Sequence, residues 1–190
     1  MKLIILDRDG VINFDSDEFI KNPDEFIPIP GSLQAIARLN QAGYTVVVAT
    51  NQSGIARGYF SEATLQQIHE KLTDLLNQAG GKIEAIYYCP HGPDDHCDCR
   101  KPKAGLLKQI LQNYPANAAT VPAIGDSLRD LQAALAVGAR PMLVKTGKGE
   151  RTLAKLAQDP QLKNTPVFED LNDAVNYLLN PDPFNPKEKH

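Results

Sequence analysis

The 190-residue sequence has no excess of basic side chains and no long hydrophobic segment. Lys plus Arg total 20 against 23 Asp plus Glu, for a formal net charge of -3, which argues against nucleic acid as a partner. No run reaches the roughly 18 uncharged apolar residues that a membrane span needs, which argues against a membrane protein. The N-terminal apolar run is too short for a signal-peptide core, so we expect a cytoplasmic protein.

Cysteine is also scarce, and the three cysteines present are too few and too close together for a disulfide framework. With one histidine they offer four sulfur and nitrogen ligands within a short loop, enough for a closed tetrahedral zinc site. These candidate ligands are Cys89, His91, Cys97 and Cys99. His96 is an alternative to the first histidine. Because a closed site has no open coordination position, we expect a structural zinc that folds the loop 89–99.

Short apolar runs alternate with segments of helical periodicity, a pattern that predicts an α/β fold with five or six parallel strands and helices on both faces. The expected strands are residues 3–6, 44–49, 83–88, 121–124, 141–144 and 167–168. The expected helices are residues 33–41, 62–79, 106–112, 128 up to the stop at Gly138, 151–157 and 172–179. Residues 1–180 are expected to form one domain. The proline-rich residues 181–190 are expected to form a flexible tail.

Two aspartates follow the first expected strand in the tetrapeptide Asp7-Arg8-Asp9-Gly10. Carboxylates in this position project from the carboxyl end of a parallel sheet, where ligands bind. A solvated turn is an alternative interpretation, as is a calcium loop, although that needs further oxygen ligands at set spacing.

Three further segments bring polar groups to the same edge of the expected sheet. Thr50-Asn51-Gln52-Ser53-Gly54 follows the second strand and offers hydroxyl, amide and backbone donors, although an ordinary polar loop has the same composition. Gly125-Asp126-Ser127 follows another strand, and its carboxylate would complete a cluster that needs a cation. Magnesium fits because it binds one or two carboxylates together with water and a substrate phosphate. Arg100-Lys101-Pro102 supplies positive charge for that phosphate.

In this order and spacing, Asp7-Arg-Asp-Gly, the strand end at Thr50, Lys101 and Gly125-Asp126-Ser-x-x-Asp130 resemble the four motifs of the haloacid dehalogenase superfamily of phosphotransferases. The resemblance covers roughly residues 1–180 and implies a Rossmann-like fold. The segments between the motifs are too short for an inserted cap domain. The implied activity is that of a magnesium-dependent phosphoric monoester hydrolase acting on a small sugar phosphate, most closely a sugar bisphosphate phosphatase.

The resemblance also implies a role for each motif residue. Asp7 would attack phosphorus and become an aspartyl phosphate, while Asp9 would protonate the leaving oxygen and then activate water. Thr50 and Lys101 would donate to the transferring oxygens. Asp130 would orient Lys101 or the water shell of the metal. The implied magnesium ligands are Asp7, the main-chain carbonyl of Asp9, and Asp126.

Substrate specificity would come from the loops near residues 13–30, 52–60 and 90–100. The substrate-binding candidates are Asn51, Gln52, Ser53, Arg57 and Arg100. The two arginines would reach hydroxyls or a distal phosphate of the substrate. The stretch 145–149 lacks the glycine spacing of a phosphate-binding P-loop, and we expect it to be a flexible surface turn.

Several alternatives share part of this pattern. Histidinol-phosphate phosphatases resemble the chain in the same motifs, including a zinc loop. A polynucleotide 3′-phosphatase fits less well because the acidic chain has no footprint for a nucleic-acid strand. A third alternative is a zinc-stabilised interaction domain without enzymatic activity. In that case the motif residues would occur together only by chance. Within the zinc loop the resemblance favours His91 over His96, and at this length we expect a monomer.

Overall fold

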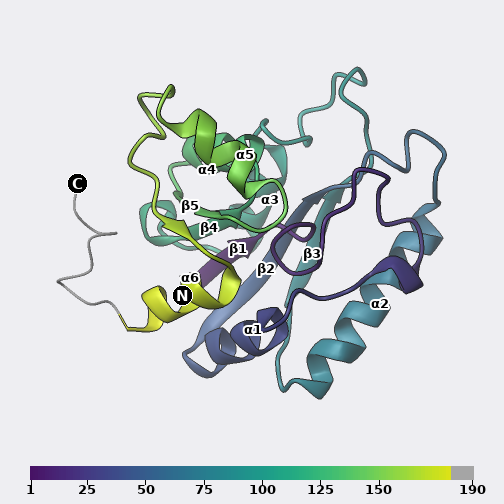
Figure 1. The fold of residues 1–190 in the computed structure, drawn as a ribbon, viewed down its shortest axis with the longest axis horizontal. Helices are drawn as coiled ribbons and strands as arrows, with labels where there is room; N and C mark the ends of the chain where they lie inside the picture. Colours follow the sequence, from purple (N-terminus) through teal and green to yellow (C-terminus); the bar gives the residue numbers. More distant parts are fainter. Residues whose placement is uncertain (181–190) are drawn as a thin grey trace.

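The computed structural model describes residues 1–180, which form a six-stranded parallel sheet with helices on both faces (Figure 1). The strand order β3-β2-β1-β4-β5-β6 is that of a Rossmann-like sheet. All six expected strands are confirmed, with ends that shift by about two residues at most. The strands are β1 (Lys2–Leu6), β2 (Tyr44–Asn51), β3 (Ala85–Cys89), β4 (Pro122–Gly125), β5 (Arg140–Val144) and β6 (Val167–Phe168). The tail expected at residues 181–190 lies outside the described residues.

Within residues 1–180 six α-helices cover the sheet, and each overlaps a segment that the sequence predicts to be helical. They are α1 (Ser32–Gln41), α2 (Glu62–Gln78), α3 (Gly105–Asn113), α4 (Leu128–Ala136), α5 (Gly149–Leu156) and α6 (Leu171–Leu179). Two short 3-10 helices, Pro23–Glu25 and Ala118–Thr120, were not expected. No helix in the described part of the chain is long and apolar enough to cross a membrane.

The two faces of the sheet pack against different helices, which explains why its strands are apolar along their whole length. Ile4 and Leu6 of β1 lie in a core with α1, α2 and α6. Leu3 and Ile5 face the other way, into a core with α3 and α4. Since each buried aliphatic side chain contributes about 1.5–3 kcal/mol, the centre of the sheet is a firm base for the groups at the strand ends.

The loops that follow β1, β2 and β3 gather beyond the carboxyl ends of the strands (Figure 1). The turn after β4 is short because α4 begins almost at once. Ser127 is the N-cap of α4, and its hydroxyl accepts a hydrogen bond from Asp130 N, while the Asp130 carboxylate accepts one from Ser127 N at 3.1 Å. This capping box fixes the Asp130 carboxylate beside the strand ends.

Candidate active site

A cavity of about 160 Å³, called the cleft below, lies beyond the carboxyl ends of the central strands. Residues from all four motif segments line it, which brings together groups that are far apart in the sequence. Of the candidate residues, those that line the cleft are Asp7, Asp9, Thr50, Asn51, Gln52, Ser53, Arg100, Lys101, Asp126 and Asp130. The strand topology therefore places the predicted motifs at one site.

Asp7 lies at the end of β1, where its backbone N–H donates to the carbonyl of Ile124 in β4 at 2.9 Å. Its carboxylate Oδ1 accepts hydrogen bonds from Arg8 N at 2.8 Å and from Lys101 Nζ at 3.1 Å. Burial raises the pKa of Asp7 to about 7, and the nearby Asp130 carboxylate adds to this rise, although Lys101 opposes it. Asp7 is thus held in place as a carboxylate that needs further positive charge.

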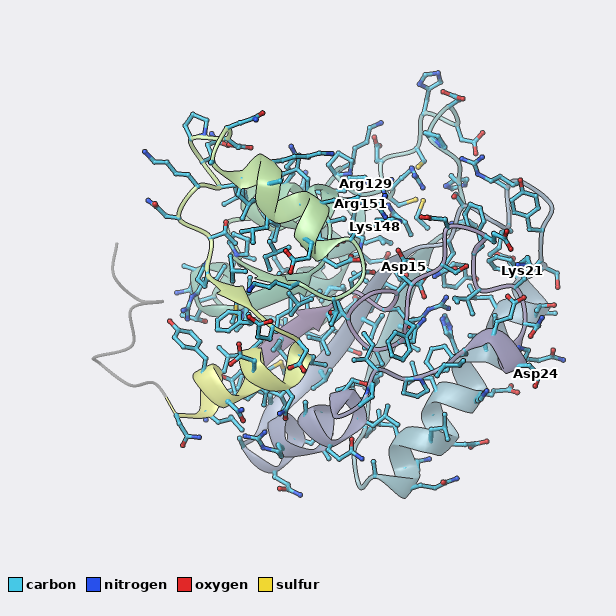
Figure 2. All side chains as sticks on the ribbon, viewed as in Figure 1. Asp15, Lys21, Asp24, Arg129, Lys148 and Arg151 are labelled. Carbon is cyan, nitrogen blue, oxygen red and sulfur yellow. The ribbon has the colours of Figure 1, made fainter. Side chains whose placement is uncertain are left out.

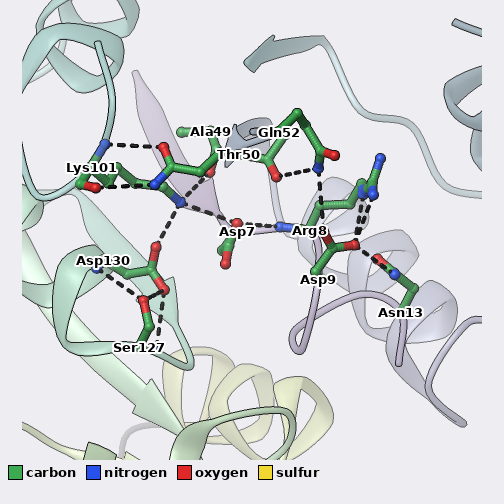
Figure 3. Close-up of polar contacts among 11 residues, drawn as sticks. Asp7, Arg8, Asp9, Asn13, Ala49, Thr50, Gln52, Lys101, Ser127 and Asp130 are labelled. Atoms are coloured by element: carbon green, nitrogen blue, oxygen red, sulfur yellow. Dashed lines mark hydrogen bonds and ion pairs between the residues drawn. The ribbon is translucent and has the colours of Figure 1, made fainter. Parts of the chain in front are cut away.

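Lys101 supplies a fixed positive charge next to Asp7 (Figure 3). Its side chain is almost fully buried, and Nζ lies 2.6 Å from Asp130 Oδ1 and 2.7 Å from the Ala49 carbonyl. Burial lowers the Lys101 pKa, but the carboxylates of Asp130 and Asp7 outweigh this and raise it above its ordinary value. Asn51 fixes the backbone of Lys101 through two hydrogen bonds of 3.0 and 3.1 Å. The expected contact between Asp130 and Lys101 is present.

The Asp9 carboxylate is oriented through one of its oxygens (Figure 3). Oδ1 lies 3.0 Å from Arg8 Nε, 2.9 Å from Arg8 Nη2 and 2.8 Å from Asn13 Nδ2. Oδ2 has a weaker contact, to Gln52 Nε2 at 3.3 Å. Two hydrogen bonds and one ion-pair contact therefore hold Oδ1, and Oδ2 remains for chemistry in the cleft.

The sequence indicates no role for Arg8 itself. The structure buries it completely, with its guanidinium 5.9 Å from the centre of the Phe26 ring. Its Nη1 lies 3.0 Å from His69 Nε2 on α2. Burial and the Arg8 charge lower the pKa of His69 to about 3, so this histidine is neutral and accepts the hydrogen bond.

Asp126 completes a cluster of three carboxylates whose oxygens lie within 4.8 Å of one another, the other two being Asp7 and Asp130. Burial raises the pKa of Asp126 to about 9, and repulsion from the other two carboxylates contributes. A divalent cation would remove this repulsion, so the donor set fits magnesium. Both oxygens of Asp130 are engaged, Oδ1 by Lys101 and Oδ2 by Ser127, whereas Asp7 and Asp126 each have one oxygen without such a contact. Asp7 and Asp126 therefore stay the predicted metal ligands.

The turn 145–149 closes the cleft next to Asp126. Lys148 N donates to Asp126 Oδ2 at 2.8 Å, and a Cβ atom on Gly147 would overlap the same carboxylate. A Cβ on Gly10 would overlap the same carboxylate oxygen. Residues 145–148 do form a turn, as expected, but the sequence does not reveal that this turn supplies a backbone donor to a candidate metal ligand.

The four predicted zinc ligands come together in the loop between β3 and α3. Cys89 Sγ lies 2.8 Å from Cys99 Sγ and 3.6 Å from Cys97 Sγ, and His91 Nδ1 is 3.3 Å from Cys99 Sγ. All three cysteines are free of disulfide bonds. The cluster fits a tetrahedral zinc ion, and His91 rather than His96 belongs to it.

Some residues at the site depart from expectation. Arg57 does not line the cleft; it is exposed, with its guanidinium 5.7 Å from the ring centre of Phe19, which does line it. Asp15, Arg129 and Lys148 do line the cleft, although no sequence pattern indicates a role for them. They lie in loops or a first helical turn, where an isolated charge looks the same as solvated surface.

This combination of a Rossmann-like parallel sheet, an aspartate pair after its first strand, a buried lysine and a third aspartate after β4 defines a phosphoric monoester hydrolase of the haloacid dehalogenase type. A family model described as HAD-hydrolase-like matches residues 98–174. A second, described as polynucleotide kinase 3 phosphatase, matches residues 2–127.

Relatives that extend over nearly the whole chain are more specific. A D-glycero-beta-D-manno-heptose-1,7-bisphosphate 7-phosphatase of Bordetella bronchiseptica is 59% identical over 94% of this chain and 98% of its own length. The phosphatase of the same name from Pseudomonas aeruginosa is 56% identical over 93% of this chain and 97% of its own length. A crystal structure of the D,D-heptose 1,7-bisphosphate phosphatase from B. bronchiseptica with magnesium and phosphate has a TM-score of 0.91 at 58% identity, covering 96% of this chain and 100% of that one. The chain belongs to this family of heptose bisphosphate phosphatases.

Proposed function

We propose that the protein removes the 7-phosphate of D-glycero-β-D-manno-heptose 1,7-bisphosphate, a step of bacterial heptose biosynthesis. The observation that carries this proposal is the Asp7 carboxylate, held by Lys101 next to Asp126, in a chain 56–59% identical to phosphatases with that substrate in their names. The sequence alone left the anomer open. The names of these relatives support the β anomer.

In the first step, a carboxylate oxygen of Asp7 attacks phosphorus, and the bond between phosphorus and the sugar oxygen breaks. Asp9 gives its proton to that oxygen, which leaves as an alcohol. The Lys101 ammonium attracts the negative phosphoryl oxygens. Thr50 accepts a hydrogen bond from Gln52 at 2.9 Å, so its own hydroxyl hydrogen is available to a phosphoryl oxygen.

In the second step, water attacks phosphorus of the aspartyl phosphate, and Asp9 accepts a proton from that water. The bond to Asp7 breaks, inorganic phosphate leaves, and the Asp7 carboxylate is restored. One carboxyl group can serve both steps because Arg8 and Asn13 hold Asp9 Oδ1 and leave Oδ2 to carry the proton.

Asp7, the main-chain carbonyl of Asp9, and Asp126 would hold magnesium. When bound, the ion supplies positive charge that screens the repulsion between an anionic nucleophile and an anionic phosphate. Cys89, His91, Cys97 and Cys99 would hold zinc, which would fix the loop that leads into Arg100 and Lys101.

The relatives favour heptose bisphosphate over the histidinol phosphate that shares these motifs. The polynucleotide phosphatase model matches only residues 2–127, whereas the heptose phosphatases align over nearly the whole chain. A small sugar phosphate therefore fits the comparisons better than a nucleic acid.

The test is phosphate release by the magnesium-supplemented enzyme from both anomers of the heptose bisphosphate and from histidinol phosphate. We expect the β anomer to be the best substrate. Asp7→Asn should lower turnover by several orders of magnitude because it removes the nucleophile.

Asp24→Asn is the matched control, since Asp24 is exposed and does not line the cleft. It should leave turnover unchanged. Full turnover by Asp7→Asn, or a clear preference for histidinol phosphate, would contradict the proposal.

A further inference from the structure

Arg8 carries a charge that is buried inside the protein and has no direct part in the proposed reaction. Its side chain is fully buried, although it lies in the turn after β1, between the cleft residues Asp7 and Asp9. A buried guanidinium is costly unless its N–H groups have partners. Among residues 1–180, the hydrogen bonds and ion pairs of this side chain go to Asp9 and His69 alone. Of these two partners, His69 lies outside the cleft.

The two partners hold different sides of the guanidinium. Nε and Nη2 lie 3.0 and 2.9 Å from Asp9 Oδ1 (Figure 3). Nη1 lies 3.0 Å from His69 Nε2. The Phe26 ring covers the group, but such a contact is not directed at any single N–H. His69 therefore fixes the plane of the guanidinium from outside the cleft, and with it the direction of the N–H groups toward Asp9.

The position of His69 is fixed by the packing of α2. This helix places its buried apolar side chains in the core beside β1 and β2. The loop after β1 lies against the same helix, where Lys71 Nζ donates to the Pro23 carbonyl at 2.6 Å. Figure 2 shows Lys21 and Asp24 of this loop on the α2 side of the molecule. A residue on such a rigid element is suited to orient another side chain.

A neutral acceptor suits this position better than a charged group. Burial and the Arg8 charge lower the pKa of His69 to about 3, so the ring is neutral and Nε2 accepts the hydrogen bond. A protonated ring would place two cations next to each other. A carboxylate would be a second anion on Arg8 and would weaken the attraction between Arg8 and Asp9. Neutral His69 orients Arg8 and leaves its charge to Asp9.

We propose that His69 is a positioning residue for the proton transfers of Asp9. The inference rests on the proposed function, in which Asp9 protonates the leaving oxygen and then accepts a proton from water. His69 holds Arg8, and Arg8 holds Asp9 Oδ1, so that Oδ2 stays available in the cleft. A proton moves efficiently only over a short, well-aligned contact. Loss of His69 should therefore slow the chemistry without removing any group that touches the substrate.

The test is a double-mutant cycle on kcat/KM for the heptose bisphosphate. His69→Leu removes the acceptor and keeps a side chain of similar volume. It should lower kcat/KM about 10- to 100-fold, the size of effect expected for a misplaced general acid. In an Asp9→Asn background the same substitution should change kcat/KM by less than about twofold, because no proton transfer is left to position.

His69→Gln should recover most of the activity, since its amide oxygen accepts the hydrogen bond from Arg8. Gln66→Leu is the matched control, because Gln66 is exposed one turn earlier on α2 and lines the same cavity between α2 and β3 as His69. It should leave kcat/KM unchanged. Melting temperatures confirm that the variants fold, and His69→Ala replaces His69→Leu if the leucine variant unfolds.

An equal loss in both backgrounds would mean that His69 only supports packing, which overturns the assignment. No loss in either background, or no recovery by His69→Gln, overturns it as well. A wild-type enzyme that releases no phosphate from the heptose bisphosphate overturns the proposed function instead. The same cycle on histidinol phosphate, whose leaving group is also an alcohol, then still tests the role of His69.

Discussion

At the scale of single residues, the cluster of Asp7, Asp126 and Asp130 determines how the protein responds to pH. Asp7 and Asp126 have pKa values raised to about 7 and about 9 from an ordinary 3.8. In the metal-free protein, the native state therefore holds protons that the unfolded chain has released. Stability should fall as pH rises through this range, because the unfolded state binds fewer protons than the native state.

Magnesium should reverse this loss, since it stabilises the ionised carboxylates. We expect the rise in melting temperature on adding magnesium to become larger between about pH 6 and pH 9. Each kcal/mol added to the free energy of unfolding corresponds to about 2–4 °C. Thermal unfolding with and without magnesium across this range measures the effect. Asp126→Asn should remove most of it, whereas a magnesium effect that is constant with pH would contradict the prediction.

Gly10 controls the position of Asp126. It has φ +82°, and a Cβ there would overlap the Asp126 carboxylate. Gly10→Ala should therefore lower magnesium affinity by about tenfold or more, in addition to about 1–2 kcal/mol of backbone strain. Isothermal titration and denaturant unfolding separate the two effects.

Gly43→Ala is the matched variant. Gly43 has φ +86°, but no atom lies within 4 Å of a Cβ built there. The Gly43→Ala variant should lose stability through the same backbone strain but keep the magnesium affinity of the unchanged protein. Equal magnesium affinities in the two alanine variants would mean that Gly10 has no part in positioning the metal ligand.

At the scale of elements, the zinc loop joins β3 to the site. Cys89 ends β3, and Lys101 follows the last predicted ligand by two residues. Cys99→Ser should lose bound zinc and lower kcat about 10- to 100-fold, because a displaced Lys101 no longer matches the transferring phosphate. Elemental analysis and steady-state kinetics provide the measurements.

His96→Ala is the control within the same loop, since His96 is exposed and outside the ligand cluster. It should keep both zinc and kcat. If His96→Ala loses zinc and His91→Ala does not, the assignment of the histidine ligand is reversed.

The elements show why the sequence predicts some features well and others poorly. A strand covered on both faces is an unbroken apolar run, and α2 has a clear apolar stripe that begins after its Ser61 cap, so both are visible in the chain. The turn 145–149 has no such signature. Its contact with Asp126 depends on β5 lying beside β4, which is a property of the sheet order and not of the local residues.

At the scale of the whole molecule, the fold explains why the motif residues predicted from the sequence lie together in the cleft. Each motif directly follows a strand or leads out of the zinc loop, so a parallel sheet brings them together whatever their separation in the sequence. Arg8 and Arg129 were missed because nothing in a single arginine distinguishes a buried or unpaired guanidinium from solvated surface. Lys148 was missed because its backbone N–H, and not its side chain, contacts Asp126. That the protein is a monomer, and that residues 1–180 are one domain, remain predictions.

The central place of β1 also matters for how the chain is made. β1 is synthesised first, but its neighbours are β2 and β4, and β4 does not exist until residue 125 has been translated. Until then one edge of β1 has no partner strand, and Asp7 lacks both Asp126 and the turn at Lys148. A nascent chain on the ribosome therefore lacks the complete site until synthesis has passed Lys148, and until then the open edge of β1 is a place where a chaperone would protect the chain.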